Sequence, residues 1–365
     1  MTWMWLGFIA FVLLLLALDL GVFHRKAHVV SVKEALSWTG VWIALALGFA
    51  AFVYHGYENH WLGLGAHPDP IDRIAEPLGE GNDGAVAVAK YLTGYVVEKS
   101  LSIDNVFAIA MIFSFFAVPP LYQHRVLFWG ILGALLLRGV MIGLGTQVIA
   151  RFSWVLYLFG AFLILTAVRM LMPGVHAPDP GRNPVVRLVR RFFPVTDHFH
   201  GEHFMVRAGS AGSREPEVPG AKAVRDSAVA GMAAGRFMLT PLALALVMVE
   251  ATDVLFAVDS IPAIFAITAD PFLVFTSNVF AILGLRSLYF ALASAIETFQ
   301  HLKVSLAVVL AVVGIKMLAH DWLREWLGAS FNFYLLGLIL AILLAGVVSS
   351  VVSGRRAARA AASAG

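Results

Sequence analysis

The chain has 365 residues, of which 60% are hydrophobic and only 13% are charged, and its mean hydropathy is +0.82. Soluble globular domains carry about 45–50% apolar and about 25% charged residues, so this composition excludes an ordinary water-soluble enzyme. The formal net charge of +3 is too small to indicate nucleic-acid binding. No cysteine is present, which excludes disulfides, thiolate metal ligands and cysteine-based catalysis.

Apolar segments long enough to cross a bilayer, which takes about 20 residues, recur along the whole chain. The first lacks a basic region before it, so we interpret it as a retained helix and not as a cleaved signal peptide. Nine segments are predicted: residues 3–23, 36–54, 86–118, 126–150, 152–171, 237–268, 272–293, 304–318 and 333–352. The prediction is an all-α polytopic membrane protein with about nine transmembrane helices, a single membrane domain over residues 1–365 embedded in the lipid bilayer.

The distribution of Lys and Arg predicts the orientation, because these residues concentrate in cytoplasmic loops. Basic residues follow the first segment, and the stretch 173–236 carries nine Lys or Arg. The linker after the second segment is acidic, and Arg355, Arg356 and Arg359 lie near the end of the chain. We therefore expect an external N-terminus, a cytoplasmic C-terminus and a cytoplasmic loop at 173–236 that acts as a linker.

Two groups of three segments on either side of that loop resemble each other. Three features recur in order, at offsets of 155, 148 and 147 residues: paired acids (Glu98 and Asp104, then Asp253 and Asp259), Ile-Leu-Gly before an arginine (Arg138, then Arg286), and a base before Met-Leu (Arg169, then Lys316). Because each group makes an odd number of crossings, the second is inverted relative to the first. The sequence thus predicts inverted three-helix repeats at 86–172 and 237–319, with the last transmembrane helix at 333–353; such repeats are typical of secondary transporters.

Charged residues inside the predicted spans are costly, at about 2.5–3.5 kcal/mol for each charge at the bilayer centre. Six acids lie there: Asp19, Glu98, Asp104, Glu250, Asp253 and Asp259. Bases in the same spans offer a purely structural explanation, in which buried ion pairs join the helices. Arg169 and Lys316 lie near span ends, where long basic side chains snorkel towards water.

The functional interpretation is a cation site, with Arg138, Arg286 and Lys99 balancing its charge. Asp104 and Asp259 rank first because they are repeat-related and each precedes a residue that offers another oxygen. Those oxygens belong to Asn105 and Ser260; the acids Asp253, Glu98, Glu250 and Asp19 complete the candidate metal ligands. Oxygen ligands without thiolate suit a hard divalent cation such as Mn(II), Mg(II) or Ca(II).

A helix break is predicted beside the second acidic pair. A six-residue spacing turns about 240° on a continuous helix, so Asp253 and Asp259 cannot face one point unless the helix is interrupted. Pro262 removes a backbone donor and is expected to break or kink the helix just beyond Asp259. The first group has Phe107 at the corresponding position.

Motifs of known enzymes do not occur: the sequence has no HExxH, no P-loop, no GxSxG and no glycine fingerprint for a dinucleotide. We therefore expect a protein that is not an enzyme and that needs no bound cofactor.

Several motifs resemble the TerC family, and most closely its Alx-type branch. They are the segments that begin at Asp19 (DLGVF), Tyr91 (YLTGY), Glu98 (EKSLSIDNVF), Arg125 (RVLFWG) and Glu250 (EATDVLFAVDSIP). The resemblance implies a LysE-like membrane transporter of the bacterial inner membrane, and it assigns the six intramembrane acids to metal recognition or passage. Alx-type members are implicated in manganese export, and the family is named for tellurium-resistance operons.

The functional expectation is export of a divalent cation, most simply Mn(II), in exchange for protons, with a role in metal homeostasis. Tellurite is an oxyanion, which a path lined by carboxylates would repel. A non-transporting scaffold, acting with membrane-complex partners or in protein metalation, stays open as the alternative, as does a homo-oligomer.

Overall fold

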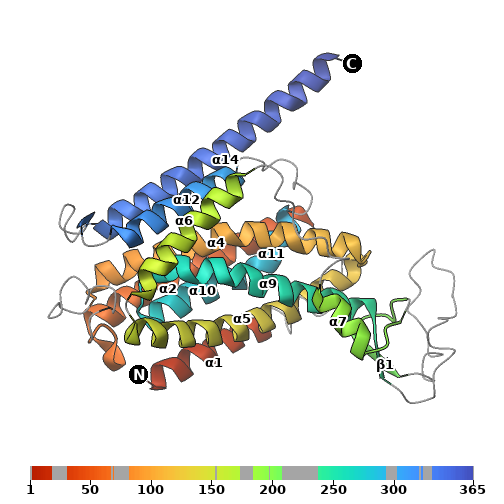
Figure 1. Cartoon of the computed structure of the whole chain (residues 1–365), viewed down its shortest axis with the longest axis horizontal. Coiled ribbons are helices and arrows are strands. Elements are labelled where there is room, and N and C mark those ends of the chain that lie inside the picture. The colour runs from red at the N-terminus through yellow and green to blue at the C-terminus, as the bar shows by residue number, and fades with distance from the viewer. Residues whose placement is uncertain are drawn as a thin grey trace.

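The computed structural model describes residues 2–18, 31–66, 69, 82–152, 154–172, 184–196, 198–207, 237–292, 302–319, 322–323 and 331–364. Its helices form an elongated bundle with the N-terminus at one end, while α14 extends beyond the other (Figure 1). The elements are α1 (Thr2–Leu18), α2 (Val32–Glu58), the 3-10 helix η2 (Trp61–Gly63), α4 (Gly84–Phe115), α5 (Pro120–Arg151), α6 (Val155–Leu171), α7 (Pro184–Phe192), β1 (Met205–Arg207), β2 (Phe237–Leu239), α9 (Pro241–Phe265), α10 (Pro271–Leu283), α11 (Leu285–Leu292), α12 (Leu302–Leu318) and α14 (Phe331–Ala364).

Helix starts follow local capping chemistry. The side chain of Asp83 accepts from the amide of Val86 at 2.6 Å at the start of α4, and Thr240 and Asp270 cap α9 and α10. In both of those helices a proline occupies the first turn, where no backbone donor is needed. These caps place the beginnings of α4, α9 and α10 at defined residues.

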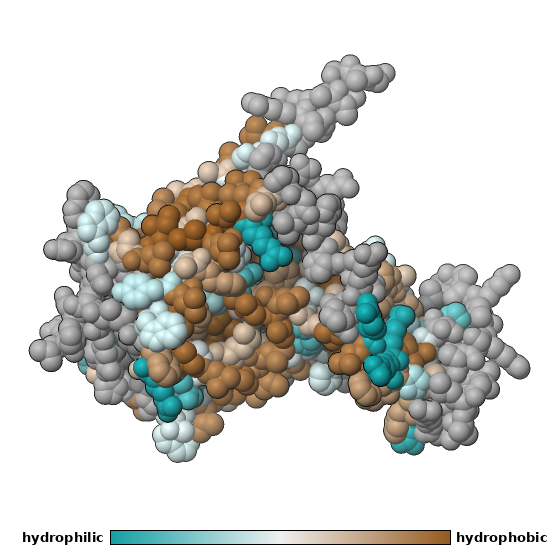
Figure 2. Space-filling view, viewed as in Figure 1, coloured by the Kyte–Doolittle hydropathy of each residue, from teal (hydrophilic) through white to brown (hydrophobic). Residues whose placement is uncertain are grey.

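Each of the nine predicted segments contains a helix among its described residues, although residues 237–239 form the strand β2. Five helical stretches are long and apolar enough to cross a membrane: α2, α5, α9, the α10–α11 pair and residues 331–350 of α14. The structure is that of an all-α membrane protein with a minor two-stranded sheet. Figure 2 shows a broad hydrophobic surface across the middle of the bundle. Many apolar side chains of the helices are exposed, among them Leu136 at 70% and Leu165 at 64%. Large exposed apolar surfaces mark contact with a membrane or with protein, and the five candidate spans favour contact with lipid.

The two groups of helices interlock. Helix α4 packs against α10, and α5 packs against α9, so the first helix of each group lies against the second helix of the other. The third helices, α6 and α12, pack directly on each other. A two-fold relation between the groups would produce this pattern of contacts; the inverted repeat itself stays a prediction.

Two local expectations were wrong. Helix α9 runs unbroken from Pro241 to Phe265 with Pro262 inside it, because this proline lies in the last turn and the helix ends three residues later. Lys316 does not snorkel: it is 3% exposed and donates to the backbone carbonyl of Ala266, an acceptor that the end of α9 leaves available.

Two further regions differ from the sequence analysis. The segment 272–293 is divided at Gly284, which lies between α10 and α11 beside the Lys99 ammonium group. The loop at 173–236 is more than a linker, since its described residues include the helix α7 and the strand β1, which pairs antiparallel with β2. A short element in a polar segment gives no clear hydrophobic period in the sequence, so it is not predicted when packing against the rest of the protein stabilises it.

A buried polar cluster joins the beginning of α4 to Asp69 and to the α9–α10 connection. Lys90 donates to Asp69 at 2.9 Å and to Asn82 at 2.6 Å, and the amide of Ala269 donates to Asp69 at 3.0 Å. Burial and the negative charge of Asp69 raise the pKa of the neighbouring Asp270. Asp69 was expected only to contribute charge to an acidic linker, and its buried ion pair with Lys90 was not predicted.

The crossing of α6 and α12 depends on two glycines and generates a first prediction. A Cβ at Gly314 would lie 2.9 Å from the carbonyl oxygen of Gly160 and 2.8 Å from Ile164, whereas Gly143 on α5 has open space. We expect Gly314→Ala to destabilise the protein by about 1–3 kcal/mol through overpacking. Tryptophan fluorescence during thermal unfolding in detergent measures the change. The control Gly143→Ala should be neutral or stabilising, and equal melting temperatures for the two variants would contradict the packing.

Candidate functional site

The centre of the candidate site is the guanidinium group of Arg138 on α5, which is 1% exposed. Its Nε and Nη2 donate to the two carboxylate oxygens of Asp253 on α9, at 3.3 and 3.0 Å. Its Nη1 forms an ion pair with Glu98 on α4, whose side chain is fully buried. A planar guanidinium matches a carboxylate with two parallel hydrogen bonds, so Asp253 is held in a fixed orientation.

Two neutral side chains complete the surroundings of Arg138. The hydroxyl oxygen of Ser260 on α9 lies 3.2 Å from Nη1, and the amide oxygen of Asn278 on α10 lies 3.4 Å from it. Both residues are buried. One arginine therefore connects four helices, two from each group: α4, α5, α9 and α10.

The charges of this cluster do not balance. Arg138 contributes one positive charge against the two carboxylates of Glu98 and Asp253, and Glu250 lies one turn before Asp253 on α9. Gly133 on α5 leaves room for Glu250, because a Cβ there would overlap the Glu250 carboxylate. Within the described residues, one buried oxygen of Glu98 and one of Glu250 have no hydrogen-bond partner. An excess of buried negative charge with unused oxygens favours a proton or a cation as a ligand.

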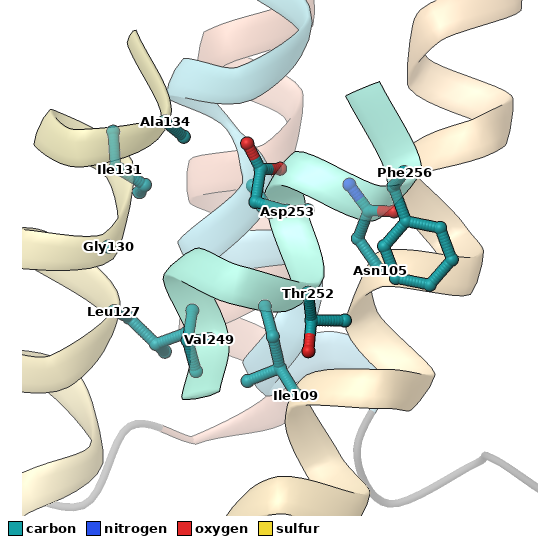
Figure 3. Close-up of a pocket in the computed structure, with 11 residues that line it drawn as sticks. Asn105, Ile109, Leu127, Gly130, Ile131, Ala134, Val249, Thr252, Asp253 and Phe256 are labelled. Atoms are coloured by element: carbon teal, nitrogen blue, oxygen red, sulfur yellow. The ribbon is translucent and has the colours of Figure 1, made fainter. Parts of the chain in front are cut away.

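A small cavity adjoins the cluster, between α4, α5, α9 and the beginning of α11. Figure 3 shows Asp253 and Thr252 on α9, between Asn105 on α4 and apolar side chains of α5. The cavity volume is about 20 Å³, and a water molecule needs at least about 10–15 Å³. One water or one bare metal ion therefore fits beside Asp253, which is the charged member of an otherwise mostly apolar wall.

The structure brings together some of the predicted site residues. Glu98, Asp253, Ser260 and Arg138 converge, and Asn105 lines the adjoining cavity. Glu98 and Asp253 are themselves repeat-related, at the offset of 155 residues. The pair that meets is thus the first acid of each motif.

Other predicted residues lie elsewhere. Asp259 accepts from Thr166 on α6 at 3.3 Å, and Asp104 is half-buried on α4. Lys99 donates to the carbonyl of Ala281 at 3.2 Å. Arg286 is buried at 4% exposure on α11, and Asp19 lies outside the described residues. Because α9 is continuous, Asp253 and Asp259 face different neighbours, as their six-residue spacing requires.

The described residues contain no group of three or more His, Asp or Glu side chains arranged to hold a metal ion. Any cation beside Asp253 would therefore depend on the amide of Asn105, the hydroxyl of Thr252, backbone carbonyls and water in addition to carboxylate. Thr252 and Asn278 were not predicted. The sequence could have indicated them, because both are small polar residues within apolar helices and a buried polar side chain normally forms a hydrogen bond.

Comparison with known proteins assigns the family. A family model described as "Integral membrane protein TerC family" matches residues 84–357. This chain belongs to the TerC family. The match begins at the first residue of α4. It includes all residues of the Arg138 cluster, which we define as Arg138, Glu98, Asp253, Ser260 and Asn278.

Several bacterial relatives cover most of this TerC-family chain. "Uncharacterized membrane protein STKORF319" of Myxococcus xanthus is 47% identical, with 88% of this chain and 85% of that protein covered. Proteins named "Putative membrane-bound redox modulator Alx" are 43% identical in Salmonella typhi and 42% identical in Escherichia coli K12, each with 87% of this chain and 86% of the relative covered. The resemblance to the Alx-type branch is thereby confirmed. No solved structure matches the chain.

Loss of the central arginine should destabilise this TerC-family protein strongly. Arg138→Met would leave Glu98 and Asp253 buried without their counter-charge, and breaking a buried pair in this way costs about 3–5 kcal/mol. We expect a lower unfolding temperature in detergent. The triple variant Arg138→Met, Glu98→Gln, Asp253→Asn should regain most of the loss, because it carries no buried charge at these three positions. Equal losses in the single and triple variants would contradict the charge pairing.

Proposed function

We propose that this protein is a transporter that carries a divalent cation, most simply Mn(II), out of the cytoplasm through the Arg138 cluster. One observation carries the proposal: a fully buried arginine is shared by two carboxylates from different helix groups, beside a cavity large enough for an ion. Intramembrane carboxylates mark ion pathways in membrane proteins.

The chemistry of the cluster favours a hard cation. Asp253, Asn105 and Thr252, whose side chains carry oxygen atoms, are among the residues that line the cavity, and the chain has no cysteine. Oxygen ligands suit Mn(II), Mg(II) and Ca(II) in preference to softer ions such as Cu(I). Arg138 orients Asp253 and reduces the net negative charge of the site. The cation is therefore bound weakly enough to be released.

The arrangement of the helices supports alternating access. The Arg138 cluster lies where α4 and α5 of one group meet α9 and α10 of the other, and movement of one group against the other would open the site to either side. In our proposal all nine predicted segments cross the bacterial inner membrane, the N-terminus is external and the C-terminus is cytoplasmic.

The name of the Alx relatives describes a membrane-bound redox modulator. With no cysteine, this chain has no thiol with which to modulate redox state. Control over a redox-active ion such as Mn(II) would connect that description with a transport site made of oxygen ligands. In this proposal the protein moves an ion and catalyses no covalent chemistry.

The transport proposal is tested by Mn(II) flux into liposomes that contain the purified protein and a metal-sensitive dye. We expect Glu98→Gln and Asp253→Asn to lower the flux about tenfold or more, the scale on which metal sites respond to loss of a ligand or its partner. Glu202→Gln, a charge change on a partly exposed side chain paired with Arg125 away from the cluster, should leave flux unchanged.

The same assay compares the acids that the sequence ranked first. Asp104→Asn and Asp259→Asn should also reduce flux if the path runs from the central cluster past α6. If both central variants, Glu98→Gln and Asp253→Asn, show the same flux as the wild type, the assignment of the transport site to the Arg138 cluster is wrong.

Proton coupling follows from the excess of buried carboxylates, each of which can hold either a proton or part of the cation's charge. We expect Mn(II) flux to rise when a proton gradient opposed to the metal movement is imposed, and to fall when an ionophore collapses it. Flux that ignores the gradient would contradict the coupling while leaving the cation site intact.

The alternative function is a membrane scaffold or assembly partner. The observation that favours it is that Arg138 already joins four helices, which is sufficient as a structural role. Absence of flux from well-folded wild-type protein under either gradient would support the scaffold and reject transport.

A further inference from the structure

Helix α7 presents three distinct faces. Val186 is buried at 5% exposure, and Val189 three residues later is half-buried on the same side. Leu188 and Phe192, four residues apart, form a second face and are 55% and 68% exposed. Packing against the protein accounts for the first face but not for the second.

The third face of α7 is basic. Arg187 and Arg191 are four residues apart, Arg190 lies three residues after Arg187, and all three are exposed. None of them has an ion-pair partner among the described residues. Figure 2 shows this hydrophilic patch beside hydrophobic surface where α7 lies in Figure 1. A short helix with adjacent exposed apolar and basic faces is typical of a helix that lies in a membrane interface.

The neighbours of α7 place it close to the ends of the membrane helices. It packs against α9, and the strand β2 ends at Leu239, only two residues before α9 begins at Pro241. The loop that leads into β1 is tied to α5 by the ion pair of Arg125 and Glu202 at 2.8 Å. Because α9 and α5 are both candidate membrane spans, these contacts hold α7 near the level where the spans leave the bilayer.

We propose that α7 binds anionic phospholipid in the membrane interface. Leu188 and Phe192 enter the boundary between headgroups and acyl chains, while Arg187, Arg190 and Arg191 contact lipid phosphates. Charge complementarity favours anionic phospholipid as the ligand, since each arginine near an anionic surface increases the binding constant about fivefold. A second copy of the chain fits poorly, because its α7 would bring three more arginines to the same surface.

Bound in this way, α7 would anchor the start of α9, the helix that carries Asp253 and Ser260. Lipid composition would then act on the helix that supplies two of the four side chains in contact with Arg138. The lipid site itself is independent of the proposed transport, because it rests on the exposure, charge and position of α7 alone.

The absence of cysteine allows a direct test with the full-length protein. A single cysteine introduced by Leu188→Cys is labelled with a nitroxide, and electron paramagnetic resonance measures its accessibility to oxygen and to a water-soluble nickel chelate. In vesicles that contain phosphatidylglycerol, we expect the label to lie about 5–10 Å below the lipid phosphates. In phosphatidylcholine alone it should be shallower. His198→Cys, at an exposed position outside α7, is the control and should contact the nickel chelate in both lipids.

Adding Arg187→Gln, Arg190→Gln and Arg191→Gln to the labelled protein should remove the difference between the two lipids. Exposure of the label at 188 to the nickel chelate, equal to that at 198 in both lipids, would overturn membrane contact. Equal depth in the two lipids would overturn the role of anionic headgroups. Protection from both reagents in every lipid would show that protein covers this face, and would also overturn the proposal. Size-exclusion chromatography confirms that each variant is folded.

Discussion

The burial of one guanidinium group among helices that face lipid is the constraint on which the rest of the structure depends. A charge in hydrocarbon is tolerated only when opposite charges and hydrogen-bond acceptors surround it. Arg138 meets this requirement by drawing Glu98 from α4, Asp253 and Ser260 from α9 and Asn278 from α10 to one point. The four helices cannot separate without exposing this charge. The contacts of Arg138 therefore both form the candidate site and hold the helices together.

The two acids of the repeated motif have different surroundings. Glu98 and Asp253 occupy equivalent positions in the two groups, yet both bind the arginine of the first group. The second acids, Asp104 and Asp259, lie six residues further along their helices and therefore on other faces; Asp259 meets Thr166 of α6. A path for an ion would then have a central pair of carboxylates and separate acids beyond it.

The two ends of the bundle are built differently. At the end of the bundle where α9 is followed by α10, Asp69 is enclosed by Lys90, Thr268 and the amide of Ala269, which satisfies its charge within the protein. At the opposite end, α7 exposes both apolar and basic side chains, which protein contacts leave available. The charge at the first end is thus paired internally, whereas the exposed side chains of α7 are the ones that we propose to contact lipid.

The sequence by itself determined the class of protein and the approximate positions of the long apolar helices, because hydrophobic length is a local property. It also placed Glu98, Asp253 and Arg138 among the candidate residues, since a charge within an apolar span is visible in the sequence. It ranked Asp104 and Asp259 above them, and it named Ser260 only as the neighbour of Asp259. Only the tertiary structure decided which of them meet, because the rotation of each helix about its axis is set by packing against its neighbours. For the same reason Thr252, Asn278, Lys90 and the exposed face of α7 became recognisable only once their surroundings were known.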